Sequence, residues 1–127
     1  MARLLEASGG SRLHLALVLV GREKVPAEVV LDLRWSQVDT DRCRLVTAAG
    51  VFPVSRGVGE LFFWHRALQR LDAWRCPRWP QSGRVFVNQH GAPITGEVAD
   101  AQLRHFCTLA GVPVVPLSGL RHPSWSR

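Results

Sequence analysis

Two short runs of β-forming residues, separated by a turn, constrain the fold of this chain most. Residues 43–47 (CRLVT) and 51–54 (VFPV) flank the small residues 48–50 (AAG), and this pattern predicts an antiparallel hairpin over about 43–54. Because Pro53 cannot donate a hydrogen bond, its strand should lie at a sheet edge. Elsewhere the apolar residues recur mostly at helical spacing. A hairpin set among helices predicts an α+β domain, mostly helical with a small antiparallel sheet.

Four helices are expected around this hairpin, over residues 11–20, 27–33, 58–74 and 95–110. The apolar spacing predicts that the helix over 58–74 buries Leu61, Trp64, Leu68 and Leu71. It also predicts that the helix over 95–110 buries Val98, Leu103, Phe106 and Leu109. Thr95 and Gly111 are predicted to cap the last helix at its two ends. A short strand is expected at 85–87. We expect residues 1–10 to be a disordered N-terminal segment and residues 11–127 to form one domain.

The charge balance favours a polyanionic partner. Lysine and arginine together number 16 against 10 acidic residues, which gives a net charge of +6, and Lys24 is the single lysine. The arginine guanidinium donates bidentate hydrogen bonds to phosphate oxygens, and its binding to nucleic acid releases condensed counterions. An arginine-rich codon usage would produce the same composition without any such partner. Composition therefore allows nucleic acid as a partner and leaves the alternative open.

The cysteines and the hydropathy pattern indicate a cytoplasmic protein without a metal or cofactor. Cys43, Cys76 and Cys107 are odd in number and widely spaced, so they form neither a disulfide framework nor a zinc motif. The five histidines lack metal-ligand spacing with cysteines or carboxylates. His14 lies in an apolar run and is expected in the core, whereas His65 and His105 are expected to be solvated. The apolar runs are too short to cross a membrane.

Four segments, in order, give the chain a resemblance to the catalytic domain of the tyrosine recombinases, the phage integrase family. LALVLVGREKVPAEVVLDLRWSQVD resembles the family's first box, and RLVTAAGVFPVS followed by LFFWHRALQRL resembles its hairpin and next helix. RVFVNQHGAPITGEVADAQLRHFCTLAGVP is similar to its strand, turn and following helix, and PLSGLRHPS resembles its second box. The resemblance runs from about Leu13 to His122 and implies an integrase-like catalytic core.

The resemblance also implies a chemistry and positions for its residues. In the family a tyrosine attacks a DNA phosphodiester, two arginines and a histidine stabilise the phosphoryl charge, and a hairpin lysine protonates the leaving oxygen. Arg121 matches the second-box arginine, and His122 matches the histidine that follows it. Ser118 stands where the box has its histidine. The register places Val25 or Pro26, rather than the nearby Arg22, at the first-box arginine.

The chain lacks the family's nucleophile, because its 127 residues contain no tyrosine. Its hairpin turn has no lysine, and we expect the helices that follow the second box in the family to be missing. We therefore expect a truncated, degenerate relative of the proteins of DNA integration and site-specific recombination, without catalysis of its own. Arg121, His122 and Arg22 are expected to retain weak DNA binding. Two alternatives stay open: one half of a split recombinase whose second polypeptide carries the tyrosine, or a mobile-element remnant without function.

Overall fold

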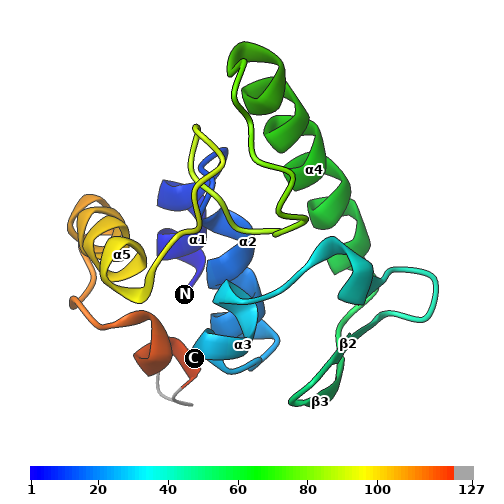
Figure 1. Cartoon of the computed structure of the whole chain (residues 1–127). Coiled ribbons are helices and arrows are strands. Elements are labelled where there is room, and N and C mark those ends of the chain that lie inside the picture. The colour runs from blue at the N-terminus through cyan, green and yellow to red at the C-terminus, as the bar shows by residue number, and fades with distance from the viewer. Residues whose placement is uncertain (122–127) are drawn as a thin grey trace.

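The structure, a computed structural model, describes residues 1–121, and it shows the α+β arrangement that the sequence predicts (Figure 1). The α-helices are α1 (Ala2–Ser8), α2 (His14–Leu17), α3 (Ala27–Leu31), α4 (Gly57–Arg75) and α5 (Gly96–Ala110). The other helical segments are the π-helical η1 (Val18–Arg22) and the 3-10 turns η2 (Trp35–Gln37) and η3 (Leu117–Arg121). In the part of the chain that is described, no helix is both long and apolar enough to span a bilayer.

The sheet contains the predicted hairpin and one further strand. Strands β1 (Val38–Asp39), β2 (Arg44–Thr47) and β3 (Gly50–Pro53) lie in this order and are all antiparallel. Leu45 pairs with Phe52 across the hairpin and is fully buried. Pro53 lies on an edge strand, as predicted. Strand β1 has only two residues, too few to show a periodicity, so the sequence did not reveal it.

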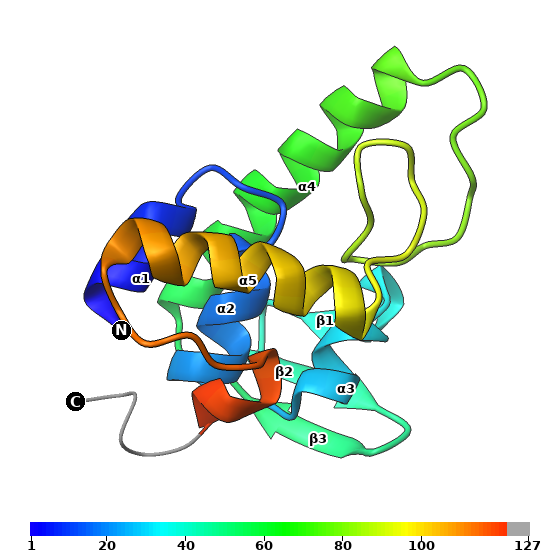
Figure 2. The ribbon, with the colours of Figure 1, turned by 90° about the vertical axis from the view of Figure 1, so that its left-hand side faces the viewer.

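The core is built around the apolar block that α2 and η1 carry. All six side chains from Leu15 to Val20 are at most 2% exposed, and this buried helix forms over residues 14–22 instead of the predicted 11–20. Helix α5 packs against α1 on one side of the block (Figure 2). Thr95 accepts a hydrogen bond from the Val98 amide, and Gly111 ends α5 in the left-handed conformation, so both predicted caps are confirmed.

The expectation that residues 1–10 are disordered is wrong. Residues Ala2–Ser8 form α1, in which Leu4 and Ser8 are fully buried. These two residues are four apart and therefore share one helical face, which lies toward α5. One large, fully buried apolar residue in so short a helix is too little pattern to distinguish the segment from a disordered polar tail. The predicted strand at 85–87 is also absent, and two isolated bridges, Arg34 to Arg84 and Val87 to Pro93, stand in its place.

Helix α4 buries a different face from the predicted one. Its buried side chains are Val58, Phe62, His65 and Asp72. Trp64 and Leu71, expected in the core, are 62% and 44% exposed. The orientation of α4 follows its polar contacts: His65 lies 2.7 Å from the Val85 carbonyl, and Asp72 binds Arg12 from the α1–α2 loop. In α5 Leu103 is buried as predicted, whereas Val98 and Leu109 are 43% and 63% exposed.

His65 is buried, contrary to the expectation that it is solvated. Its Nε2 atom lies 2.7 Å from the Val85 carbonyl oxygen, and because a carbonyl only accepts, Nε2 carries the proton. The ring packs against Phe86, with 5.0 Å between ring centroids. Burial lowers the pKa of His65, and the Val85 carbonyl and Asp72 oppose this shift only in part. Burial also lowers the pKa of His14, helped by the charge of Arg22.

These lowered pKa values predict that the protein loses stability in mild acid. As pH falls below the ordinary histidine value of 6.5, the unfolded chain takes up protons before the folded chain does, so the free energy of unfolding decreases. Urea unfolding at pH 7 and pH 5 measures this change. We expect a smaller decrease in His65→Asn, with His105→Asn, a substitution of an exposed histidine, behaving as the wild type. An equal decrease in all three proteins would contradict the assignment to His65.

Candidate functional site

The C-terminal turn η3 has a buried and an exposed face, and the exposed face carries two of the predicted site residues. Leu117 and Leu120 are buried in the core, whereas Ser118 and Arg121 are exposed. Residues three apart eclipse one another in a 3-10 helix, so Ser118 and Arg121 lie on the same side of the turn. The buried leucines thus hold the hydroxyl and the guanidinium at the surface.

A hydrogen bond ties Arg121 to the loop between η1 and α3. The Arg121 Nε donates to the Lys24 carbonyl oxygen at 3.0 Å, across 97 positions of sequence. Lys24 has a φ of 62°, a left-handed conformation that is unusual for a residue with a side chain. The turn η3 also packs against η1, where Gly21 lies beside Leu120 and Met1. The fold therefore brings Arg121 to the segment that contains Arg22, although the two are distant in sequence.

The loop beside Arg121 is held in turn by the end of the hairpin. The Glu23 carboxylate accepts a hydrogen bond from the Ser55 amide, just beyond β3. The Arg22 guanidinium lies 3.8 Å from the same carboxylate, and half of its side chain is exposed. A long, half-exposed pair of this kind contributes little to stability. Arg22 is therefore available to a ligand, while Glu23 fixes the loop.

Lys24 adds a third cation, which the sequence did not place in the site. Its Nζ atom is buried and has no hydrogen-bond partner among the residues that the structure describes. A buried ammonium without a partner is costly, and an anion above it would relieve that cost. Arg22, Lys24 and Arg121 are called the basic loop site below. In the sequence, the only signal for a cation here is that Lys24, the single lysine, lies between Arg22 and Pro26. The family's lysine lies on the hairpin, so the resemblance did not assign Lys24 to the site.

The basic loop site differs from the arrangement that the resemblance implies. Val25 is buried and Pro26 precedes α3, so neither candidate for the first-box position supplies a cation. The hairpin turn 48–50 is exposed and carries no charge. His122 lies outside the described residues. Within residues 1–121 there is also no group of three or more histidine, cysteine, aspartate or glutamate residues that could hold a metal.

The cations and hydroxyl of this surface suit a phosphate. Guanidinium groups donate to phosphate oxygens in charge-assisted hydrogen bonds, and exposed Ser118 can donate one more. The nearby Glu23 carboxylate, which accepts from the Ser55 amide, brings one negative charge against three positive ones, so the balance of charge is positive. The same groups offer no general base, because serine and arginine do not exchange protons near neutral pH. The arrangement can thus bind a phosphate and stabilise its charge.

Comparison with known proteins shows which class of protein shares this fold. The structure is similar to the crystal structure of XerA recombinase, with a TM-score of 0.78 and 16% sequence identity. The match covers 98% of this chain and 46% of that one, so the chain spans about half of its length. No family model matches the sequence, and no curated protein matches it either. The fold is therefore recombinase-like, as the resemblance predicted.

Proposed function

We propose that this recombinase-like chain binds the phosphate backbone of DNA through the basic loop site. The observation that carries the proposal is the hydrogen bond from Arg121 to the Lys24 carbonyl, because it gathers cations from two distant segments at one surface. The net charge of +6 supports it, since a positive protein attracts a polyanion over long range. Contacts to phosphates carry no base sequence. The expected binding is therefore weak and independent of sequence.

The proposed binding is not accompanied by strand cleavage by this chain alone. Recombination of the tyrosine type needs a tyrosine nucleophile, and the 127 residues contain none. Ser118, in the position of the family's histidine, is a poor proton donor and acceptor near neutral pH. The function we propose is thus DNA binding related to recombination, in which any tyrosine-dependent chemistry depends on a nucleophile outside these 127 residues.

Replacing Arg121 by alanine should weaken binding to a short DNA duplex about tenfold, because one charge-assisted contact to a phosphate is lost. Arg121→Lys, which keeps the charge, should lose less. Arg78→Ala removes one charge from the exposed segment after α4, which lies at the opposite end of the molecule from η3 (Figure 1). This control should bind as the wild type. Fluorescence anisotropy of labelled duplex at low salt measures all four proteins.

Equal weakening by Arg121→Ala and Arg78→Ala would show that only the net charge matters, and would contradict the site. Circular dichroism of each variant verifies that it is folded. The same mixtures, run on a denaturing gel, give a second readout of the proposal. No covalent protein–DNA band is expected, even with a nicked substrate that prevents rejoining. Such a band would contradict the absence of cleavage, and Ser118→Ala would then be the first variant to examine.

A further inference from the structure

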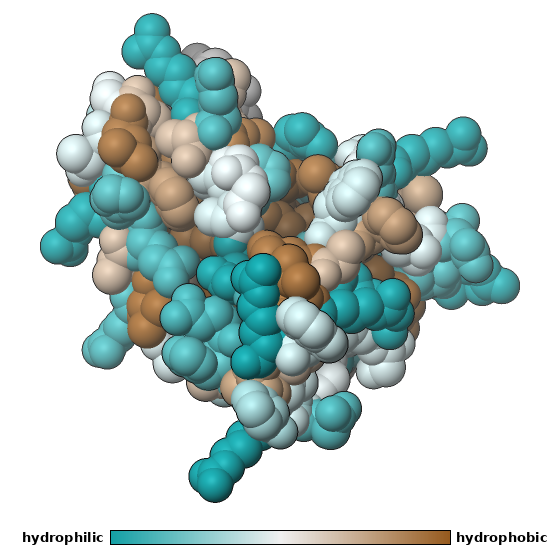
Figure 3. Space-filling view, turned by 90° about the horizontal axis from the view of Figure 1, so that it is seen from above, coloured by the Kyte–Doolittle hydropathy of each residue, from teal (hydrophilic) through white to brown (hydrophobic). Residues whose placement is uncertain are grey.

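The solvent face of α4 is apolar over most of the helix. At about 100° per residue, seven apolar positions that are exposed or half-buried lie within an arc of roughly 160°, which Arg66 and Arg70 border on one side. The apolar residues in this arc are Leu61, Phe63, Trp64, Ala67, Leu68, Leu71 and Trp74. Trp64 is 62% exposed and Trp74 83% exposed. Exposed apolar patches of this kind mark interaction sites. Figure 3 views the molecule from the end of α4, and apolar side chains lie exposed there between charged ones.

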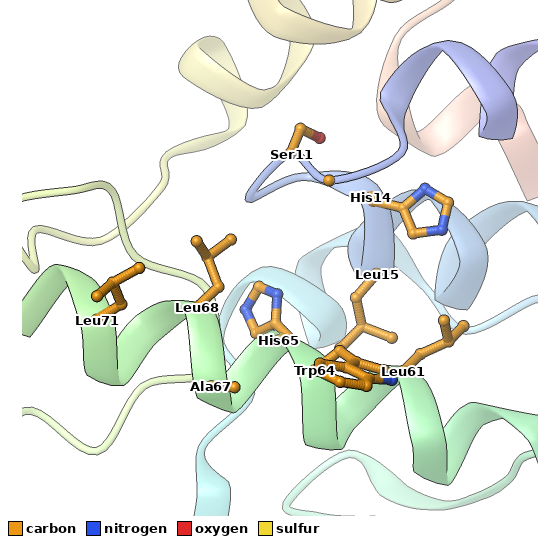
Figure 4. A pocket seen from close by; sticks show the side chains of 10 residues that line it. Ser11, His14, Leu15, Leu61, Trp64, His65, Ala67, Leu68 and Leu71 are labelled. Carbon is orange, nitrogen blue, oxygen red and sulfur yellow. The ribbon is translucent and has the colours of Figure 1, made fainter.

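A groove runs along one side of this face. It has a volume of about 390 Å³ and lies between α4 and residues 10–15. Leu61, Trp64, Leu68 and Leu71 line it from α4, with His14 and Leu15 opposite (Figure 4). Most of the groove surface is thus contributed by apolar side chains, which favours an apolar occupant over a charged ligand.

We propose that this face binds α4 of a second copy of the chain in an antiparallel helix pair. The order of residues in α4 carries the proposal, because six of the seven apolar residues of this face pair with one another about the bond between Ala67 and Leu68. The seventh, Phe63, lies at the edge of the arc and is level with the partner's Asp72. With a two-fold axis at that bond, Trp64 faces the partner's Leu71 and Leu61 faces the partner's Trp74. Ala67 faces the partner's Leu68, and its small side chain lets the helices approach closely. A two-fold interface requires this self-complementarity.

The charges at the two ends of the face agree with the same register. Glu60 and Arg75 lie equally far from the axis, so each Glu60 faces the partner's Arg75. Both residues are exposed, and neither takes part in an ion pair among residues 1–121. Opposite charges at such rim positions fix register and orientation. Shifting the register by one residue would place Trp64 opposite either Arg70 or the buried Asp72, so the pairing of Trp64 with Leu71 favours the proposed register.

The length of α4 suits this pairing. Its 19 residues span roughly 28 Å at 1.5 Å per residue, and the symmetric positions from Glu60 to Arg75 occupy most of that length. The helix also stands out from the remainder of the molecule toward its C-terminal end (Figure 1), so a second copy can approach it. In the pair, the partner's Trp74 would lie beside Leu61 and fill part of the groove. The groove and the helix face would then have the same occupant.

Light scattering during size-exclusion chromatography tests the proposal on the purified chain. The wild type should elute with a mass near 28 kDa, twice the 14.1 kDa of one chain. Leu71→Glu, in the centre of the face, should elute as a monomer. Leu109→Glu places the same charge on an exposed leucine of α5 that is 63% exposed, and it should remain a dimer. A monomeric wild type at about 100 µM, or equal effects of the two variants, would overturn the proposal.

A charge exchange tests the register directly and does not depend on the apolar variants folding. Glu60→Arg and Arg75→Glu each replace two attractive pairs by two repulsive ones, so each should raise the dissociation constant of the dimer about tenfold. The double variant should return it to within about twofold of the wild type. Sedimentation equilibrium measures these constants. A double variant as weak as the single ones would contradict the antiparallel register.

Discussion

Replacing Arg12 by alanine should lower the free energy of unfolding by about 2–3 kcal/mol, because it leaves a buried carboxylate without its partner. The Arg12 Nε and Nη2 atoms donate to the two carboxylate oxygens of Asp72, each at 2.7 Å. The Asp72 side chain is 7% exposed and that of Arg12 is 35% exposed. A fully buried pair would cost more to break, and partial exposure of the guanidinium reduces the loss. Urea unfolding at one protein concentration measures the difference.

Two further variants separate the ion pair from other effects of the substitution. Arg70→Ala removes the same charge from an exposed position of α4, and it should change the free energy of unfolding by less than about 0.5 kcal/mol. The double variant R12M/D72M replaces both charges by apolar side chains and should recover most of the loss. If Arg12→Ala were as stable as Arg70→Ala, the pair would not anchor α4, and its orientation would need another explanation.

DNA affinity should fall about 12-fold between roughly 50 and 200 mM salt if the two exposed cations of the basic loop site, Arg22 and Arg121, act on phosphates. Each neutralised phosphate contributes about −0.9 to the slope of log affinity against log salt. Arg22 and Arg121 together therefore give a slope of about −1.8, and the buried Nζ of Lys24 adds no direct contact. Anisotropy titrations of one duplex at several salt concentrations measure the slope. An affinity that does not depend on salt would contradict binding through phosphates.

The parts of the fold that depend on local pattern were predictable from the sequence. The hairpin followed from alternating β-forming residues around a turn, and the caps of α5 followed from Thr95 and Gly111. The face that α4 buries was not predictable, because it is decided by the hydrogen bond that His65 donates to Val85 and by those that Asp72 accepts from Arg12. The apolar spacing of Leu61, Trp64, Leu68 and Leu71 was real, but it marks a surface that remains exposed in the single chain.

The candidate site was predictable only in part, for a similar reason. The sequence order identified Arg121 and Ser118 by resemblance, and the structure places them together on the exposed face of η3. Lys24 was missed because its place beside Arg121 depends on two features without a sequence pattern. These are the Lys24 carbonyl, which accepts a hydrogen bond from Arg121, and the left-handed backbone of Lys24. Glu23 was missed because its partner, Ser55, is an amide donor beyond the hairpin. Such contacts between distant segments form only once the chain has folded.

The salt dependence of DNA binding by the wild type and by Arg121→Ala tests the central claim most directly. If Arg121 contacts a phosphate, its loss should change the slope of log affinity against log salt by about 0.9, from about −1.8 to about −0.9. Arg78→Ala, measured in parallel, should keep the slope of the wild type. An unchanged slope in Arg121→Ala, or an equal change in both variants, would contradict a phosphate site at η3 and the loop beside it.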